Sequence, residues 1–212
     1  MSRPRRTVTA AAIRHLRTDP VMAAVIDRAG PCDLVPRRQT PFESLGRAVI
    51  HQQLSGKAAG TILGRFEALF GSGGFPPPHA VLQTPPERLR SAGLSGAKTR
   101  YILGLAAEAA VGNIPTLEGC DALSNQELLD RLTALHGIGR WTAEMMLIFN
   151  LGRPDVLPVH DLGVRKGFHI AYRKRAMPTP KQLDRFGLRW APYRTTAAWY
   201  LWRATEFPAE AK

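Results

Sequence analysis

Cysteine is almost absent from this chain. Cys32 and Cys120 are the only two among 212 residues, which excludes a disulfide framework and any site built from four cysteines, such as an iron–sulfur cluster. No apolar run reaches the roughly 18 residues that a membrane span needs. The basic N-terminal stretch is not followed by an apolar segment with a cleavage site, so we expect no secretory signal and a cytoplasmic protein.

Acidic residues are also scarce. Seventeen Asp and Glu stand against 29 Lys and Arg, for a net charge of +12. Residues 1–40 and 151–212 carry this excess, whereas residues 41–150 are neutral. A neutral middle between basic ends is typical of a protein that holds one face near a polyanion. A basic bias of the whole proteome explains the same counts, so charge alone leaves nucleic-acid binding undecided.

The sequence lacks the alternating pattern of β-strands, and its apolar residues recur every three or four positions instead. Asp19-Pro20 opens a helix that Gly30 closes. Four further helix starts are indicated by Thr or Ser followed three residues later by Glu or Gln: Thr40–Glu43, Thr84–Glu87, Ser124–Glu127 and Thr179–Gln182. The pattern predicts an all-α protein with nine or ten helices and little or no sheet.

Glycine and proline cluster in two segments, residues 71–79 and 152–160, which we predict to be loops. The length suits one helical unit over residues 1–212. If this unit has two lobes, we expect one over 41–135 and the other from 1–40 together with 136–212.

A Gly-x-Gly hairpin is the most informative stretch. Gly137 and Gly139 lie between a helix that ends near Leu135 and one predicted from about Arg140. Glycines here leave backbone N–H groups open to a phosphate at the positive end of a helix, as in a helix–hairpin–helix that holds nucleic acid. Ile138 would pack between the two helices. A plain corner between helices with a capping glycine explains the same residues.

Asp161 follows the second loop and precedes a predicted helix. In isolation it is most simply a helix N-cap. Beside a phosphate-binding hairpin, the same carboxylate would stabilise positive charge developing on a deoxyribose.

Four ordered segments together resemble the helix–hairpin–helix DNA glycosylase superfamily, in its alkylbase branch of 3-methyladenine DNA glycosylase II enzymes. They are residues 50–59, residues 93–102, residues 135–143 with 156–163, and residues 190–202. The resemblance covers roughly residues 40–205. It implies two helical lobes with a DNA- and base-binding cleft between them, in a compact form without the N-terminal β domain of some members.

The resemblance also implies roles for single residues. Asp161 falls on the catalytic aspartate, and Leu54 on the wedge that fills the gap left by a flipped nucleotide, although a core leucine is the alternative for Leu54. The base pocket falls on Trp141, Trp202 and Met145. The contacts with the DNA backbone fall on Gly137, Gly139, Arg140 and Thr142. A site for Na⁺ or K⁺, formed by backbone carbonyls, falls on Thr133, Leu135 and Ile138.

The implied activity is that of a monofunctional DNA glycosylase that removes alkylated purines from duplex DNA in base excision repair. We expect a DNA-associated monomer that requires no cofactor beyond that monovalent cation, contains no iron–sulfur cluster and binds no membrane. Position 141 is Trp where strand-cleaving members have a nucleophilic lysine, so no lyase activity is expected. Two alternatives remain: the same fold acting on deaminated or oxidised bases, and a non-enzymatic protein that recognises DNA damage or shape.

Overall fold

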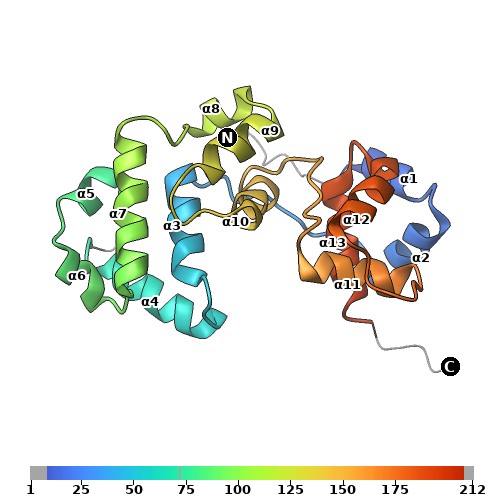
Figure 1. Cartoon of the computed structure of the whole chain (residues 1–212), viewed down its shortest axis with the longest axis horizontal. Coiled ribbons are helices and arrows are strands. Elements are labelled where there is room, and N and C mark those ends of the chain that lie inside the picture. Colours follow the sequence, from blue (N-terminus) through green and yellow to red (C-terminus); the bar gives the residue numbers. More distant parts are fainter. Residues whose placement is uncertain (1–8, 72, 208–212) are drawn as a thin grey trace. The chain divides into compact units, whose positions relative to one another are not determined.

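The computed structural model describes residues 9–71 and 73–207, and every regular element in them is helical (Figure 1). The predicted all-α class is confirmed. The prediction of nine or ten helices was too low, since thirteen α-helices occur in the described residues. The count was low because short helices of five or six residues, such as α5 and α8, are not resolved by apolar periodicity. None of the helices found there is long and apolar enough to cross a membrane.

The chain forms two compact units, which are residues 1–37 with 147–212 (unit 1) and residues 38–146 (unit 2). Unit 2 holds α3 to α10, and α7 packs against both α3 and α5. Leu45, Ile50 and Ile102 are fully buried in its core. Its helices are α3 (Pro41–His51), α4 (Gly56–Ala68), α5 (Pro78–Leu82), α6 (Pro86–Ser91), α7 (Gly96–Ala110), α8 (Leu117–Ala122), α9 (Asn125–Thr133) and α10 (Arg140–Met145).

Unit 1 is built around α13, which packs against α11 and α2. An aromatic cluster lies beside it, in which Phe168 stacks on Tyr172 and Phe186 contacts both Phe168 and Trp190 edge-on. The elements of this unit are α1 (Ala10–Leu16), α2 (Pro20–Ala29), α11 (Leu162–Ala171), α12 (Pro180–Gly187), the 3₁₀ turn η2 (Leu188–Trp190) and α13 (Arg194–Ala204). A π-helical turn, η1 (Met146–Asn150), continues α10 across the boundary between the units.

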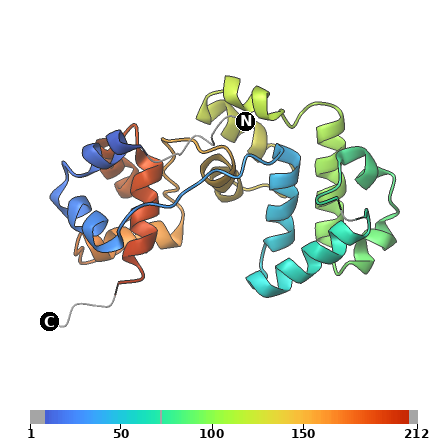
Figure 2. The same ribbon diagram turned by 180° about the vertical axis from the view of Figure 1, so that it is seen from behind.

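The division differs from the expected lobes at the hairpin. Residues 136–146 belong to unit 2 and not with the C-terminal segment. The reason is packing, because α10 contacts α9 and α3 and Ile138 is buried. Residues 31–39, which connect α2 to α3, contain no helix (Figure 2).

Three of the predicted helix starts are confirmed by their caps. Ser124 and Thr179 each form a capping box. The hydroxyl of the cap accepts from the N–H of the third helical residue, and the side chain of that residue, Glu127 or Gln182, accepts from the backbone N–H of the cap. Thr40 accepts from the N–H of Glu43 and opens α3. A side-chain cap of this kind typically stabilises a helix by about 1 kcal/mol.

A helix also begins at the fourth predicted start, but one residue later than expected, and the predicted cap by Thr84 was wrong. Thr84 donates its hydroxyl to the carbonyl of Ala80 at 2.9 Å, so it closes α5, and α6 begins two residues later at Pro86. Asp19 and Gly30 cap the two ends of α2, as predicted.

The first predicted loop is shorter than expected, because Pro78 begins α5. Pro fits this first helical position, where its missing N–H is not needed. Within the described part of the loop, Phe75 packs against Phe42 and Phe66. The loop is therefore anchored in the core of unit 2.

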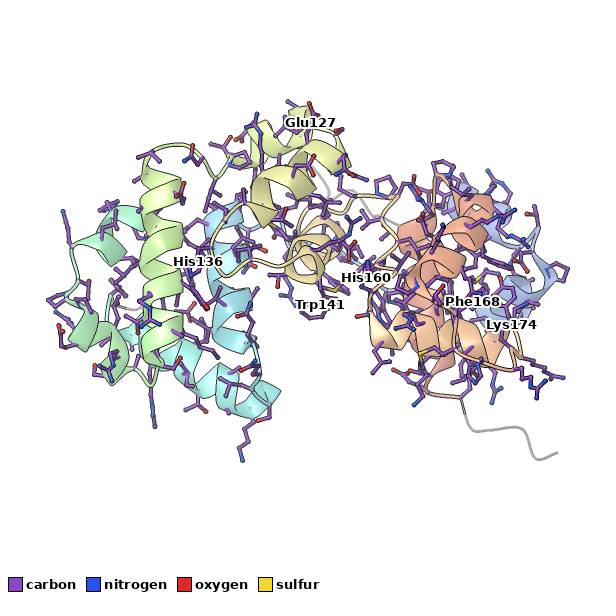
Figure 3. All side chains as sticks on the ribbon, viewed as in Figure 1. Glu127, His136, Trp141, His160, Phe168 and Lys174 are labelled. Atoms are coloured by element: carbon purple, nitrogen blue, oxygen red, sulfur yellow. The ribbon has the colours of Figure 1, made fainter. Side chains whose placement is uncertain are left out.

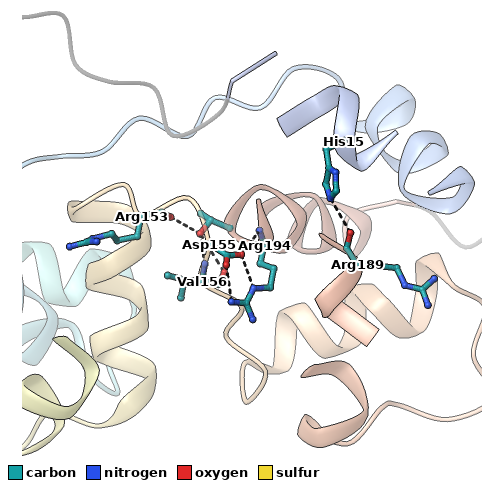
Figure 4. A network of polar contacts seen from close by, with 7 residues as sticks. His15, Arg153, Asp155, Val156, Arg189 and Arg194 are labelled. Atoms are coloured by element: carbon teal, nitrogen blue, oxygen red, sulfur yellow. Dashed lines mark hydrogen bonds and ion pairs between the residues drawn. The ribbon is translucent and has the colours of Figure 1, made fainter. Parts of the chain in front are cut away.

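The second predicted loop, residues 152–160, is confirmed and is held firmly on α13 (Figure 4). Asp155 accepts from the Nε and Nη2 of Arg194 at 2.7 and 2.8 Å. This bidentate ion pair raises the pKa of the Arg194 guanidinium above its usual value. The buried Thr195 hydroxyl donates to the carbonyl of Arg153 at 2.6 Å and accepts from the Val156 N–H at 3.0 Å. These bonds fix the segment that leads directly to Asp161.

Candidate functional site

Asp161 is the N-cap of α11. Its Oδ1 accepts from the N–H of Val164 at 2.8 Å. The same oxygen accepts from the indole Nε1 of Trp202, also at 2.8 Å. The carboxylate thus serves as a cap, and it is also fixed to a tryptophan on α13, which capping does not require. The predicted cap is therefore confirmed, and capping leaves the carboxylate able to make a second interaction.

The position of Trp202 depends on two further residues, Phe149 and Gly163. Its ring stacks on Phe149, with centroids 5.6 Å apart and an interplanar angle of 28°. Gly163 makes the approach of Asp161 and Trp202 possible, because a Cβ there would lie 2.8 Å from the indole ring and 3.1 Å from the Asp161 carboxylate. Trp199, by contrast, is only 7% exposed and is therefore a core residue.

The two hairpin glycines have different roles. Gly137 has a φ of +86°, and a Cβ on it would meet the ring of Tyr101 at 2.8 Å, so the backbone there requires glycine. Gly139 has an ordinary extended conformation, and a Cβ added to it would have no neighbouring atom within 4 Å. Alanine could therefore replace Gly139 without strain, whereas at Gly137 it could not. Of the two glycines, only Gly139 has open space beside its Cα.

Gly139 is also the N-cap of α10, and it supplies no side-chain hydrogen bond to the first-turn amides. Arg140 is half exposed, and its Nε donates to the buried carboxylate of Glu144 at 2.9 Å. Thr142 is only 5% exposed, so its side chain is not presented at the surface of the hairpin. The tip of the hairpin thus presents backbone donors and one positioned guanidinium.

Two of the predicted pocket residues lie on α10. Trp141 is 50% exposed, unusual for so large an apolar ring (Figure 3). Met145 ends the helix and is half buried. Both belong to unit 2, whereas Asp161 and Trp202 belong to unit 1.

Leu54 is 39% exposed, which rejects the alternative of a core leucine. It lies directly after the end of α3, in a turn that includes Gln53 with a φ of +57°. Sequence analysis missed the residues that hold this turn, which are Lys98 on α7 and Gln52. Their partners are backbone atoms, so no pattern of side chains reveals them.

The carbonyls expected to hold a cation lie where α9 ends and the hairpin begins. Thr133 is the last residue of α9, the Leu135 carbonyl accepts from the N–H of Ile138 at 3.1 Å, and Ile138 is buried in the turn. Neutral carbonyl oxygens at a helix C-terminus suit a monovalent cation. Among the described residues there is no cluster of three or more His, Cys, Asp or Glu that would hold a metal ion.

A cavity of about 700 Å³ lies elsewhere in unit 1, lined in part by Ile13, Ile26, Cys32 and Tyr200. Burial raises the pKa of the Cys32 thiol to about 12, which disfavours the reactive thiolate at neutral pH. His160, next to Asp161, is exposed (Figure 3).

Comparison with known proteins identifies the family. Residues 47–192 match the family of HhH-GPD superfamily base excision DNA repair proteins. The chain is 42% identical over 169 residues to DNA-3-methyladenine glycosylase 1 of Schizosaccharomyces pombe, covering 80% of this chain and 74% of that protein.

Two solved structures are similar over nearly the whole chain. The 3-methyladenine DNA glycosylase of Schizosaccharomyces pombe in complex with abasic DNA is 37% identical with a TM-score of 0.83, covering 96% of this chain and 100% of that one. A DNA-3-methyladenine glycosidase of Bacillus halodurans is 36% identical with a TM-score of 0.85, covering 96% and 92%. This chain therefore belongs to the HhH-GPD superfamily of base excision DNA repair proteins.

Proposed function

We propose that this protein is a DNA glycosylase that hydrolyses the N-glycosidic bond of alkylated purines, such as 3-methyladenine and 7-methylguanine, in duplex DNA. Its family acts in base excision repair, and the similar proteins named above are 3-methyladenine glycosylases. One of them was solved with abasic DNA, the product of such a reaction. The net charge of +12 suits a polyanionic partner.

The observation that carries the proposal is the carboxylate of Asp161, bound at 2.8 Å by both the Val164 N–H and the Trp202 indole. Two donors on one oxygen hold the group in a single orientation. A preorganised charge costs no reorganisation when positive charge develops on the substrate, and this is how a fixed group lowers a barrier.

The reaction follows from that charge. When the C1′–N bond of an alkylated purine breaks, its electron pair moves to the base, which leaves as a neutral molecule because alkylation had made it cationic. The sugar acquires oxocarbenium character, and the Asp161 carboxylate stabilises this state more than the neutral sugar of the ground state. Water then adds to C1′ and releases its proton to the carboxylate or to solvent. No strong general acid is needed for a leaving group of this kind.

DNA binding rests on the hairpin. The N–H groups at the start of α10, with Gly139 in open space beside them, suit a phosphate of the DNA backbone. Arg140 adds a charge that Glu144 holds in position. The carbonyls of Thr133, Leu135 and Ile138 fit Na⁺ or K⁺ at the same turn, where a bound cation would neutralise phosphate charge. Contacts of this kind position the duplex without reading its sequence.

Base extrusion and recognition rest on apolar and aromatic side chains, of which Leu54 and Trp141 are exposed. Extruding a nucleotide costs a few kcal/mol, and Leu54, which is 39% exposed, suits a wedge that fills the vacated stack. The faces of Trp141 and Trp202, together with the polarizable side chain of Met145, would attract a cationic base. Attraction of this type favours alkylated purines over the neutral bases produced by deamination or oxidation.

The enzyme stops at the abasic site in this proposal, because strand cleavage requires an amine that forms a Schiff base with the sugar. Trp141 occupies the position at which a lyase would carry its lysine, and residues 140–161 contain no lysine. The protein acts as a monomer on damaged duplex DNA.

The direct test is base release from a panel of duplexes that contain 7-methylguanine, 3-methyladenine, hypoxanthine, uracil or 8-oxoguanine, with the released base identified by mass. We expect release of the alkylated purines and an intact abasic strand. Release of only deaminated or oxidised bases would change the substrate class, and binding without release of any base would support the non-enzymatic alternative.

A further inference from the structure

The turn that carries Leu54 is strained, and several of its backbone groups are held by hydrogen bonds. Gln52 and Gln53 form the middle of a turn closed by a bond of 3.3 Å from the Leu54 N–H to the His51 carbonyl. Gln53 occupies a position that favours glycine, with a φ of +57°. A non-glycine residue there persists only when the surroundings hold it, and such residues cluster at functional sites.

Lys98 holds the turn in this conformation through two hydrogen bonds. Its Nζ donates to the carbonyl of Ile50 at 2.7 Å and to that of Gln52 at 2.8 Å. Both carbonyls lie at the C-terminus of α3, where a helix leaves its last carbonyls without internal partners and carries partial negative charge. Burial lowers the pKa of the Lys98 ammonium, in keeping with its position between α7 and this turn.

Lys98 itself lies in an unfavourable place on its own helix. It is in the first turn of α7, which contains no acidic residue, and its positive charge there opposes the helix dipole. The two carbonyls of α3 compensate for this. The charge therefore serves the end of α3 rather than the stability of α7.

The turn is also tied to the hairpin. The side-chain Nε2 of Gln52 donates to the carbonyl of Gly137 at 3.3 Å. Tyr101, one helical turn after Lys98 on α7, lies against Gly137 and packs edge-on against His136. The first two turns of α7 thus contact both the turn of Leu54 and the tip of the hairpin.

We propose that Lys98 is a positioning residue for base extrusion: it holds the Leu54 turn at a fixed place relative to the phosphate-binding hairpin. This inference rests on the proposed function, since it assigns Leu54 to the wedge. Its consequence is specific. Loss of Lys98 impairs the extrusion of a paired nucleotide, whereas a lesion that is already unpaired needs little help from the wedge.

The test compares Lys98→Met with Lys181→Met, which removes the same charge from an exposed position on α12 of unit 1. Single-turnover excision of 7-methylguanine is measured in two duplexes, one with cytosine and one with an abasic site opposite the lesion. We expect Lys98→Met to slow excision from the paired duplex about 10- to 100-fold relative to the control, the size typical of a reacting group misplaced by about 1 Å. The loss should shrink to a few-fold in the unpaired duplex, and affinity for abasic duplex should match that of the control.

Two further variants keep the test decisive. Lys98→Arg, which retains several donors, should recover most of the rate on the paired duplex. Gln52→Met, which removes only the side-chain bond to Gly137, should show the same dependence on pairing and is used if Lys98→Met does not fold. Equal losses on both duplexes, or no loss beyond that of Lys181→Met, would overturn the inference while leaving the proposed function intact. A wild-type protein that releases no alkylated purine would overturn both.

Discussion

Replacing Asp161 by Asn separates the capping role from the catalytic one. An Asn side chain has the same shape and retains an oxygen that accepts from the Val164 N–H and from Trp202 Nε1, the two bonds of 2.8 Å. Asn and Asp are about equally good N-caps. Only the interaction of the charge with the helix dipole is lost, roughly 0.3–1 kcal/mol. The stability of the variant should therefore fall by less than about 1 kcal/mol.

The rate should fall much further. Removing one preorganised electrostatic contact typically costs roughly 3–4 kcal/mol, or about two to three decades in the rate of the chemical step. The assay is single-turnover base release at saturating enzyme, with melting temperature and affinity for abasic duplex measured on the same preparation. Asp161→Ala is the companion variant. It loses the cap, about 1 kcal/mol, and leaves the Trp202 N–H without this acceptor, about 1–3 kcal/mol more.

The activities and stabilities of the two variants together distinguish a catalytic role of Asp161 from a capping role. If Asp161 acts on the substrate, Asn and Ala lose similar amounts of activity although Ala is clearly the less stable protein. If Asp161 were only a cap, activity would follow stability, and Asn would excise at near the wild-type rate. An Asn variant that folds, binds DNA and releases base normally would refute the catalytic assignment.

Three other outcomes are expected at the hairpin and its neighbours, and a fourth at Cys32. Gly139→Ala should leave the melting temperature unchanged, because its Cβ has open space, yet weaken duplex binding about tenfold for all sequences through one lost phosphate contact. Gly137→Ala, with its φ of +86° and Tyr101 at 2.8 Å, should destabilise the fold by about 1–2 kcal/mol or more; equal melting temperatures for the two variants would contradict this. Borohydride should trap no covalent enzyme–DNA adduct, since Trp141 stands in place of an amine. Because burial raises the pKa of the Cys32 thiol to about 12, Cys32 should react with a thiol reagent at pH 8 much more slowly than an ordinary cysteine, and labelling at a normal rate would contradict this raised pKa.

Local patterns predicted the helices well where the decisive contacts are local. The caps at Ser124 and Thr179 bond to groups three residues away, so their spacing alone identified them. Thr84 has the same spacing, but its hydroxyl bonds backward to Ala80. A hydroxyl that can serve either neighbouring helix is assigned by the path of the chain between them, which spacing does not contain.

The candidate site was located by the sequence, but its geometry was not. Asp161 and Trp202 are 41 residues apart, and their bond exists because α11 and α13 pack together with a glycine at position 163. No periodicity in either helix predicts which tryptophan of α13 faces the carboxylate. The exposure of Leu54 likewise became known only from the structure, because the helical spacing around it is compatible with a core leucine and with an exposed one.

The contacts of Lys98 could be indicated by the sequence only in part. Its acceptors are backbone carbonyls, and every residue has one, so the sequence of α3 cannot mark where the ammonium will bind. What the sequence does show is an anomaly: a cation in the first turn of a helix where acidic residues are favoured. Lys57 presents the same anomaly at the start of α4 and is exposed to solvent. A first-turn lysine therefore indicates only that its charge is stabilised outside its own helix, by solvent or by another element. The difference between Lys57 and Lys98 is tertiary, because the ammonium of Lys98 donates to the carbonyls of Ile50 and Gln52 at the C-terminus of α3, whereas Lys57 is exposed to solvent.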